Sequence, residues 1–475
     1  MAPVALIFCV SFILCLLLRE SKRHNSVSAA LWLPTVVVFV LASRTPSLWL
    51  EGGPIFSDQA NNLGGNWMDQ VFFLTTIVGS LIIATSRGVK WSKLLVANFG
   101  IMLFYGYFLT SSIWSDAPGD SLIRILKDFG ATVVVLAVIF SEKDPLEAVR
   151  SVFTRCACVL FPLSMLFVRY YPVYGRTYAR SGEVTFSGAA LQKNSLGEFV
   201  MICCLFMIWD HLETRPKGAK WWWSGLGWDR LALLPMGFWL LKISDSKTSL
   251  VCLLVGLILL LRTGWLASPL VNRIVFSIAL SLPFLMFFTQ EFSSTVGPII
   301  GVLGRDATFT GRTDIWKQIT YTTVNPLLGA GFYNFWGGKG GQAIRQAMNT
   351  PVPNAHDGYL DLYLDGGLLG LIVLFCLLVL SGRKLMGMLP ANRWQQFRFA
   401  FLVVVIFANL TESNFARPSI LWFTTLLVLI DFPDLRVDGP NAYEPPEREN
   451  GIGLPPVANR KWKKAYVGEH RIIKN

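Results

Sequence analysis

Charged residues are scarce in this sequence. Asp, Glu, Lys and Arg make up 15% of its 475 residues, whereas soluble domains carry about 25%. Hydrophobic residues account for 53%. This composition excludes an ordinary soluble protein, a disordered chain and a collagen-like chain.

Cysteine and histidine are also rare, with eight and four residues respectively. Every cysteine lies inside an apolar run, where a free thiol behaves as a small hydrophobic group. Cys203 and Cys204 are adjacent, which does not suit a four-cysteine zinc site. The sequence therefore predicts no disulfide scaffold, no metal site and no cofactor.

Long apolar runs recur along the chain instead. Runs of about 18 residues or more indicate membrane spans, so we expect an all-α polytopic membrane protein with about twelve to thirteen transmembrane helices over residues 1–432. Several runs are short for a bilayer core that takes roughly 20 residues, so one pair could be re-entrant. The predicted spans lie near 4–18, 29–43, 71–86, 94–113, 121–140, 153–168, 195–212, 229–243, 249–265, 273–290, 359–380, 395–413 and 417–432.

Positive charges gather between these runs. The net charge is +12, but basic clusters such as Arg383-Lys384 fall in alternate loops, as they do in the cytoplasmic loops of polytopic proteins. We therefore expect the lipid bilayer, and no nucleic acid, as a partner. The alternation places loops 169–194 and 291–358 outside, and the Pro-rich segment 433–475 inside as a disordered tail.

The outer loop 291–358 is long enough to be functional in its own right. Thr310 or Thr313 is a suitable N-cap, and Ile315 and Ile319 are four residues apart, which predicts a short amphipathic helix. Arg312 stands at its start, where free N–H groups and the helix dipole favour an anion such as a pyrophosphate. The alternative is an arginine paired with Asp314 or Asp306 on a solvated surface.

His356 is the one histidine expected on the outer face, since His24 and His211 fall on the cytoplasmic side and His470 in the tail. An imidazole there is a candidate base at neutral pH, although an isolated histidine is usually structural. Tyr333, Phe335 and Trp336 could stack on sugar rings or lie at the membrane interface.

Further cations face the same side. Arg169, Arg176, Arg180 and Lys193 lie in or next to the second outer loop, and Lys247 lies in a short outer turn. A lysine at membrane depth is costly unless it is paired or solvated, although it can also snorkel to the interface. The pattern suits a polyanionic lipid headgroup.

Six motifs, in this order, resemble the O-antigen ligase and exopolysaccharide polymerase superfamily. The resemblance covers most of the chain and is closer to the exopolysaccharide polymerase branch. The motifs are Ser43–Trp49, Gln192–Gly197, Ser246–Ser249, Thr310–Trp316, Asn325–Gly331 and Ala355–Leu360.

This resemblance implies a C-type glycosyltransferase fold with a partly helical outer loop, in the bacterial inner membrane. It implies a metal-independent enzyme that transfers an undecaprenyl-diphosphate-linked oligosaccharide to a sugar hydroxyl of a polysaccharide or glycolipid acceptor. One alternative is an O-antigen ligase that acts on lipid A core. An alternative of another class is a non-enzymatic transporter, or flippase, of the same lipid-linked oligosaccharide.

The resemblance also implies site residues. Lys247 stands where the family has Arg, which keeps the charge but loses the bidentate fork. Asp357 follows His356 where Asn is usual, and Gln192 stands where many relatives have His. The expected roles are catalysis by His356 and Asp357, diphosphate binding by Arg312, Lys247, Arg176, Arg180 and Lys193, and sugar binding by Trp316, Trp336 and Tyr359.

The charge alternation predicts that loop 291–358 lies outside and residues 433–475 lie inside. A cysteine introduced at Gly338 should therefore react with a membrane-impermeant thiol reagent while the inner membrane is intact. Labelling only after that membrane is permeabilised would contradict the topology and the outer site with it.

Overall fold

The computed structural model describes residues 1–23, 26–52, 66–178, 183–216, 224–262, 268–288, 312–349, 352–389 and 392–432. The chain divides into two units, Met1–Leu435 and Arg436–Asn475. The predicted tail 433–475, the segment 291–311 of the outer loop with Thr310, and Arg180 lie outside the described residues.

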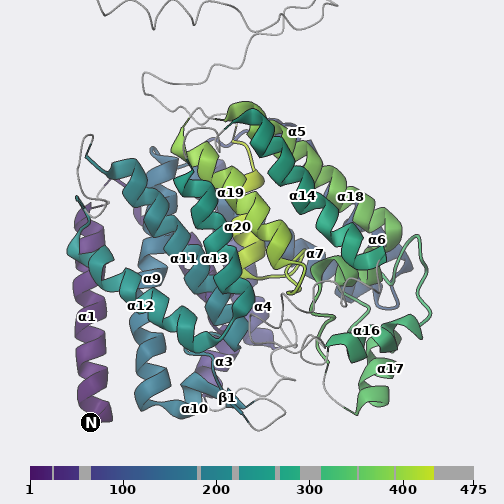
Figure 1. Cartoon of the computed structure of the whole chain (residues 1–475), viewed down its shortest axis with the longest axis horizontal. Helices are drawn as coiled ribbons and strands as arrows, with labels where there is room; N and C mark the ends of the chain where they lie inside the picture. The colour runs from purple at the N-terminus through teal and green to yellow at the C-terminus, as the bar shows by residue number, and fades with distance from the viewer. Residues whose placement is uncertain are drawn as a thin grey trace, which may run out of the picture. The chain divides into compact units, whose positions relative to one another are not determined.

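Each predicted span coincides with a helix or with consecutive helices (Figure 1). The helices in these positions are α1 (Ala2–Arg23), η1 and α2 (Ala29–Leu31, Trp32–Ala42), α4 (Trp67–Ser86), α5 and α6 (Trp91–Ala97, Phe99–Ser111), α7, η4 and α8 (Pro118–Phe129, Gly130–Val134, Val135–Phe140), α9 (Pro145–Tyr170), α11 (Lys193–Thr214), α12 (Trp228–Ser244), α13 (Lys247–Leu261), α14 (Pro269–Phe288), α18 (Gly358–Met388), α19 (Arg393–Ala408) and α20 (Ile420–Leu429).

Shorter elements connect these helices. They are α3 (Pro46–Glu51), η3 (Ser112–Trp114), α10 (Pro172–Gly175), α16 (Arg312–Thr320), α17 (Lys339–Met348) and the strands β1 (Arg176–Tyr178) and β2 (Val184–Phe186). The two strands form an antiparallel hairpin in which Thr177 pairs with Thr185.

The predicted fold class is confirmed, because the described chain is helical apart from this hairpin and has several helices able to cross a membrane. Within the described ranges, five helices are long and apolar enough to cross a membrane, or six if α5 and α6 with η3, bent by 92° at Asn98, form one span. This is fewer than the twelve or thirteen expected from the runs, since several helices are short. The shorter apolar helices are Ala29–Ala42, Lys247–Leu261, Pro269–Leu285 and Ile420–Leu429.

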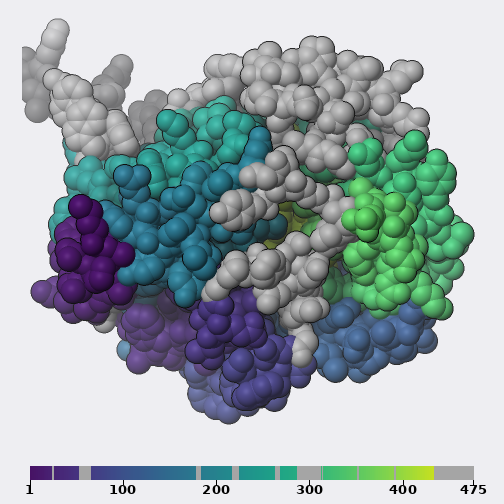
Figure 2. Space-filling model, turned by 90° about the horizontal axis from the view of Figure 1, so that it is seen from below, coloured from purple at the N-terminus to yellow at the C-terminus, as the bar shows by residue number. Residues whose placement is uncertain are grey.

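Helices α9 and α11 form the centre of the bundle. Of their most apolar windows, 72% and 83% are buried inside the protein, whereas α1 buries 11%. Apolar side chains on α1 such as Phe8 and Leu18 are exposed, as expected for a helix that faces lipid. The N-terminus of α1 and the pair α16–α17 lie at the same end of the bundle (Figures 1 and 2).

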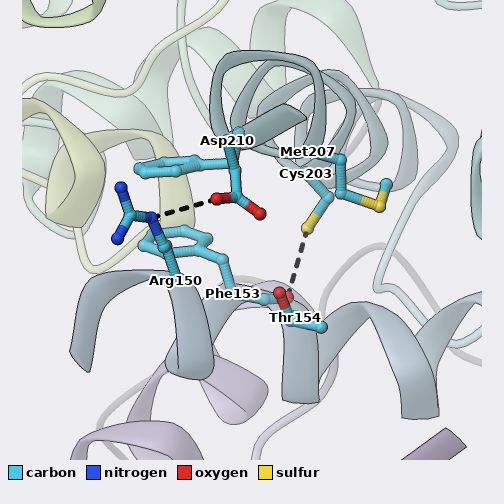
Figure 3. A pocket seen from close by; sticks show the side chains of 7 residues that line it. Arg150, Phe153, Thr154, Cys203, Met207 and Asp210 are labelled. Carbon is cyan, nitrogen blue, oxygen red and sulfur yellow. Dashed lines mark hydrogen bonds and ion pairs between the residues drawn. The ribbon is translucent and has the colours of Figure 1, made fainter. Parts of the chain in front are cut away.

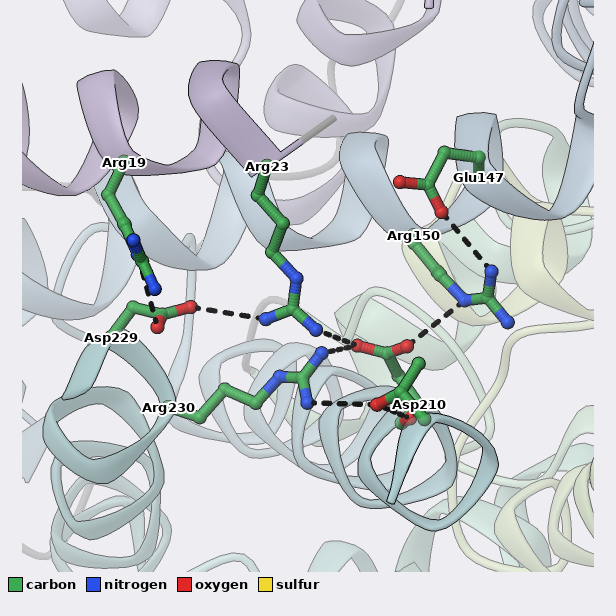
Figure 4. A network of polar contacts seen from close by, with 8 residues as sticks. Arg19, Arg23, Glu147, Arg150, Asp210, Asp229 and Arg230 are labelled. Atoms are coloured by element: carbon green, nitrogen blue, oxygen red, sulfur yellow. Dashed lines mark hydrogen bonds and ion pairs between the residues drawn. The ribbon is translucent and has the colours of Figure 1, made fainter. Parts of the chain in front are cut away.

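An arginine–carboxylate network joins the other end of α1 to α9, α11 and α12 (Figure 4). Asp210 is its centre: it pairs with Arg150 at 3.0 Å, with Arg23 at 3.7 Å and with Arg230. Arg23 also reaches Asp229 at 3.6 Å. The buried carboxylates thereby neutralise cations that a membrane protein could not otherwise enclose.

A small cavity opens beside this network, between α9 and α11 (Figure 3). Arg150 and Asp210 form its polar wall, and Phe153, Cys203 and Met207 form its apolar wall. It belongs to the structural network and not to the outer loop where chemistry is expected.

Asp210→Asn should destabilise the protein by about 3–5 kcal/mol, because it leaves three arginines around a neutral amide in a buried site. Thermal unfolding of the detergent-purified protein measures this loss. Glu147→Gln is the matched control, since Glu147 pairs with Arg150 in a more exposed position (3.2 Å) and should change stability by about 0–1 kcal/mol. Equal effects of both substitutions would contradict the central role of Asp210.

Candidate active site

The predicted amphipathic helix of the outer loop is present as α16, Arg312–Thr320. Ile315 and Ile319 are buried in a hydrophobic cluster with Phe335 and Trp336. Their spacing of four residues places both on one face of the helix. The loop after α16 therefore folds back on it and fixes the helix that carries Arg312.

Arg312 is buried, with 5% of its surface exposed. Its Nη2 donates to Oε1 of Glu412 at 3.2 Å, and Asp314 is exposed. Arg312 is thus not on a solvated surface, and its partner is Glu412 and not Asp314, whereas Asp306 lies outside the described residues. Nη1 of Arg312 is also buried and has no hydrogen-bond partner among the described residues.

Glu412 is a site residue that the sequence analysis missed. It lies in the loop 409–419 between α19 and α20, is 5% exposed, and its Oε1 also accepts from Nδ2 of Asn194 at 2.8 Å. It thereby joins the outer loop to the start of α11. An acid between two apolar spans was the available signal, because such a group needs a cation.

Lys247 begins α13 and pairs with Asp245 at 3.0 Å. The other oxygen of Asp245 lies 3.9 Å from Nζ of Lys193, so one carboxylate connects the two predicted lysines. The next residue, Thr248, forms a hydrogen bond of 2.6 Å with Thr411. The lysine pair therefore lies next to the loop that carries Glu412.

Arg176 has a different position. Its Nε and Nη2 donate to the carbonyl oxygen of Val168 at 3.1 and 3.0 Å, and its guanidinium lies over the ring of Phe186. These contacts hold the hairpin of β1 and β2. Of the predicted diphosphate-binding residues, the described structure thus brings together Arg312, Lys193 and Lys247.

The His356 turn, which we define as residues 354–358, joins the same loop 409–419. The N–H of Gly358 donates to the carbonyl oxygen of Asn409 at 2.8 Å. His356 is half-buried, has a φ of 53°, and its N–H donates to Oδ1 of Asn354 at 3.0 Å. The predicted base and the predicted anion-binding cations are therefore held by one loop.

Asp357 is the N-cap of α18. Its Oδ1 accepts from the N–H groups of Tyr359 and Leu360 at 2.9 and 3.0 Å. Burial raises the pKa of Asp357 to about 7, although these hydrogen bonds and the charge of Arg312 oppose the rise. This carboxyl group can thus exchange a proton near neutral pH, but one of its oxygens is committed to the helix.

The predicted sugar-binding aromatics are mostly in the core. Trp336 is 7% exposed and its Nε1 donates to Asp361 at 2.6 Å; Tyr359 is 1% exposed and its hydroxyl donates to the carbonyl of Ile406 at 3.1 Å. Both rings are therefore buried in this structure, Trp336 against Phe335 and Tyr359 against Phe375 and Phe415. Trp316 is half-buried, and its Nε1 donates to the carbonyl oxygen of Ala355 at 2.9 Å.

Part of this chain is similar in sequence to known proteins. Residues 231–375 match the family described as O-antigen ligase. This match supports the resemblance to the O-antigen ligase and exopolysaccharide polymerase superfamily that the motifs predict. It is also similar to "Exopolysaccharide production protein ExoQ" of Rhizobium meliloti (strain 1021), with 27% identity over 59% of this chain and 63% of that protein.

The superfamily match spans Lys247, Arg312 and His356, together with α16 and the first half of α18. Lys193 and Glu412 lie outside it and reach the site through tertiary contacts. The aligned segment covers less than two thirds of the R. meliloti protein.

Glu412→Leu should destabilise the protein by about 3–5 kcal/mol, because Arg312 is then a buried charge without its carboxylate. Adding Arg312→Met should recover part of that loss. Thermal unfolding of wild type, both single variants and the double variant provides a double-mutant cycle. Additive losses would contradict a direct buried pair.

Proposed function

We propose that this protein is a glycosyltransferase of the inner membrane that transfers an undecaprenyl-diphosphate-linked oligosaccharide to a sugar hydroxyl during exopolysaccharide assembly. The observation that supports this most is that one loop, 409–419, contacts the elements that carry Arg312, Lys247 and His356. Anion-binding groups and a base side by side are what transfer from a lipid diphosphate requires.

The cations would hold the diphosphate of the donor. Glu412 and Asp245 now pair with Arg312 and with Lys193 and Lys247, and a diphosphate offers the same kind of oxygen ligand with more charge. It would compete with these two carboxylates for the three cations. Negative charge that develops on the leaving oxygen is then met by groups already in place.

His356 would accept the proton. The oxygen of the acceptor hydroxyl bonds to the anomeric carbon, the bond from that carbon to the diphosphate oxygen breaks, the hydroxyl proton passes to His356, and the lipid diphosphate leaves. Asp357 is a second acceptor candidate or a group that orients His356, since its pKa of about 7 suits proton exchange.

The similarity to a protein named for exopolysaccharide production favours polymerisation of repeat units. The alternative is ligation to lipid A core, which uses the same donor and the same chemistry on another acceptor. Both acceptors offer a sugar hydroxyl, so the described residues support the reaction class and leave the acceptor to be assigned.

His356→Ala should lower kcat by about 10²- to 10⁴-fold, the range that general base catalysis supplies. Binding of the lipid-linked donor should survive, because the cations are intact. Turnover and donor binding are measured on the purified protein in nanodiscs. If His356→Gln keeps full activity, His356 is not the base.

Asp357→Asn tests the neighbouring carboxyl group. An amide oxygen can still accept from the N–H groups of Tyr359 and Leu360, so the helix cap is kept, and Asn is the usual residue of the superfamily. We expect activity near that of wild type. An inactivation comparable to that of His356→Ala would instead place the carboxylate in the mechanism.

A further inference from the structure

The peptide groups next to His356 are held from both sides. The N–H of Ala355 donates to Oδ1 of Asp361 at 3.0 Å. The carbonyl oxygen of the same residue accepts from Nε1 of Trp316 at 2.9 Å. Ala355 is fully buried. Its N–H and C=O groups therefore cannot bond to water, and Asp361 and Trp316 supply the partners that they need.

The conformation of His356 explains why such anchoring is needed. Its φ of 53° lies in the left-handed region, which residues other than glycine adopt at a cost and keep only when the surroundings impose it. A turn without its anchors would relax toward ordinary backbone angles. The side chain of His356 would then move with the turn.

Asp361 is itself fixed by two further groups. Its Oδ2 lies 3.1 Å from Nη2 of Arg417, with side chains 3% and 11% exposed, and its Oδ1 also accepts from Nε1 of Trp336. Arg417 in turn lies over the ring of Tyr333, 4.6 Å from its centroid. These contacts hold the carboxylate group of Asp361 in place where the turn needs an acceptor.

Trp316 adds a link between the two halves of the site. It lies on α16, four residues after Arg312, so the helix that presents the guanidinium also holds the turn that presents the imidazole. A displacement of about 1 Å between reacting groups can cost 10²-fold in rate. The hydrogen bond of Trp316 therefore helps to fix the distance between Arg312 and His356.

We propose that Asp361 and Trp316 are positioning residues for His356, and that Arg417 holds Asp361 in place for this role. The proposal rests on the proposed function of His356. It assigns Trp316 a task other than the sugar stacking expected from the sequence, and it gives a role to an aspartate that the sequence analysis did not single out.

Trp316→Phe tests the first anchor, because it removes the indole N–H and keeps an aromatic ring in the cluster. We expect kcat to fall about three- to tenfold, the loss of one buried hydrogen bond, with donor binding unchanged. Trp114→Phe is the matched control: Nε1 of Trp114 also donates to a backbone carbonyl, that of Leu328 at 3.1 Å, but away from the His356 turn. Equal losses of kcat in both variants would overturn the proposal.

Asp361→Asn and Asp361→Ala test the second anchor. The amide oxygen of Asn can still accept from Ala355, so Asp361→Asn should retain at least threefold more kcat than Asp361→Ala, with the same donor affinity in both. Full activity of Asp361→Ala and Trp316→Phe beside an inactive His356→Ala would overturn the positioning role alone. An active His356→Ala would instead overturn the base assignment on which the role rests.

Discussion

The buried pair of Arg312 and Glu412 is the interaction on which the rest of the site depends. A guanidinium enclosed in an apolar bundle must have a carboxylate, since an unpaired charge there costs several kcal/mol. Glu412 meets this need from loop 409–419, which also contacts Asn194, Thr248 and Gly358. Pairing one charge thus brings together the starts of α11, α13, α16 and α18.

The same pairing determines how the site can bind an anion. Lys193 and Lys247 share Asp245 as Arg312 holds Glu412, so the site is a set of compensated cations and not an open positive patch. A diphosphate would exchange with these carboxylates, and burial strengthens the contact with Arg312, whereas Lys193 and Lys247 are partly exposed to solvent. When the diphosphate dissociates, Glu412 and Asp245 can pair with the cations again, which makes its release less unfavourable.

Much of the fold follows from the sequence because long apolar runs have few alternatives to helices in a membrane. The spacing of Ile315 and Ile319 likewise predicts the short helix that begins at Arg312. The number of full spans could not be predicted from the sequence, because α13 and α20 are short apolar helices whose composition resembles that of true spans.

Only part of the candidate site could be predicted from the sequence. Residue type and sidedness pointed to Arg312, Lys247 and His356. Glu412 lies 100 residues from its partner Arg312, whereas Asp245 and Asp361 lie near Lys247 and His356 in the sequence but carry no motif, so the contacts in the structure are needed to assign them. The aromatics are a similar case, because Trp336 and Tyr359 suit a sugar platform and a core position equally well in the sequence, and only the structure shows that both are buried.

The most direct test of the account is turnover by the purified protein in proteoliposomes that contain an undecaprenyl-diphosphate-linked oligosaccharide and a saccharide acceptor. The measured quantities are the glycosylated acceptor and the released undecaprenyl diphosphate. A glycosyltransferase should form both in equal amounts. Movement of the intact lipid-linked oligosaccharide between leaflets, with neither product formed, would contradict this expectation and would indicate a transporter.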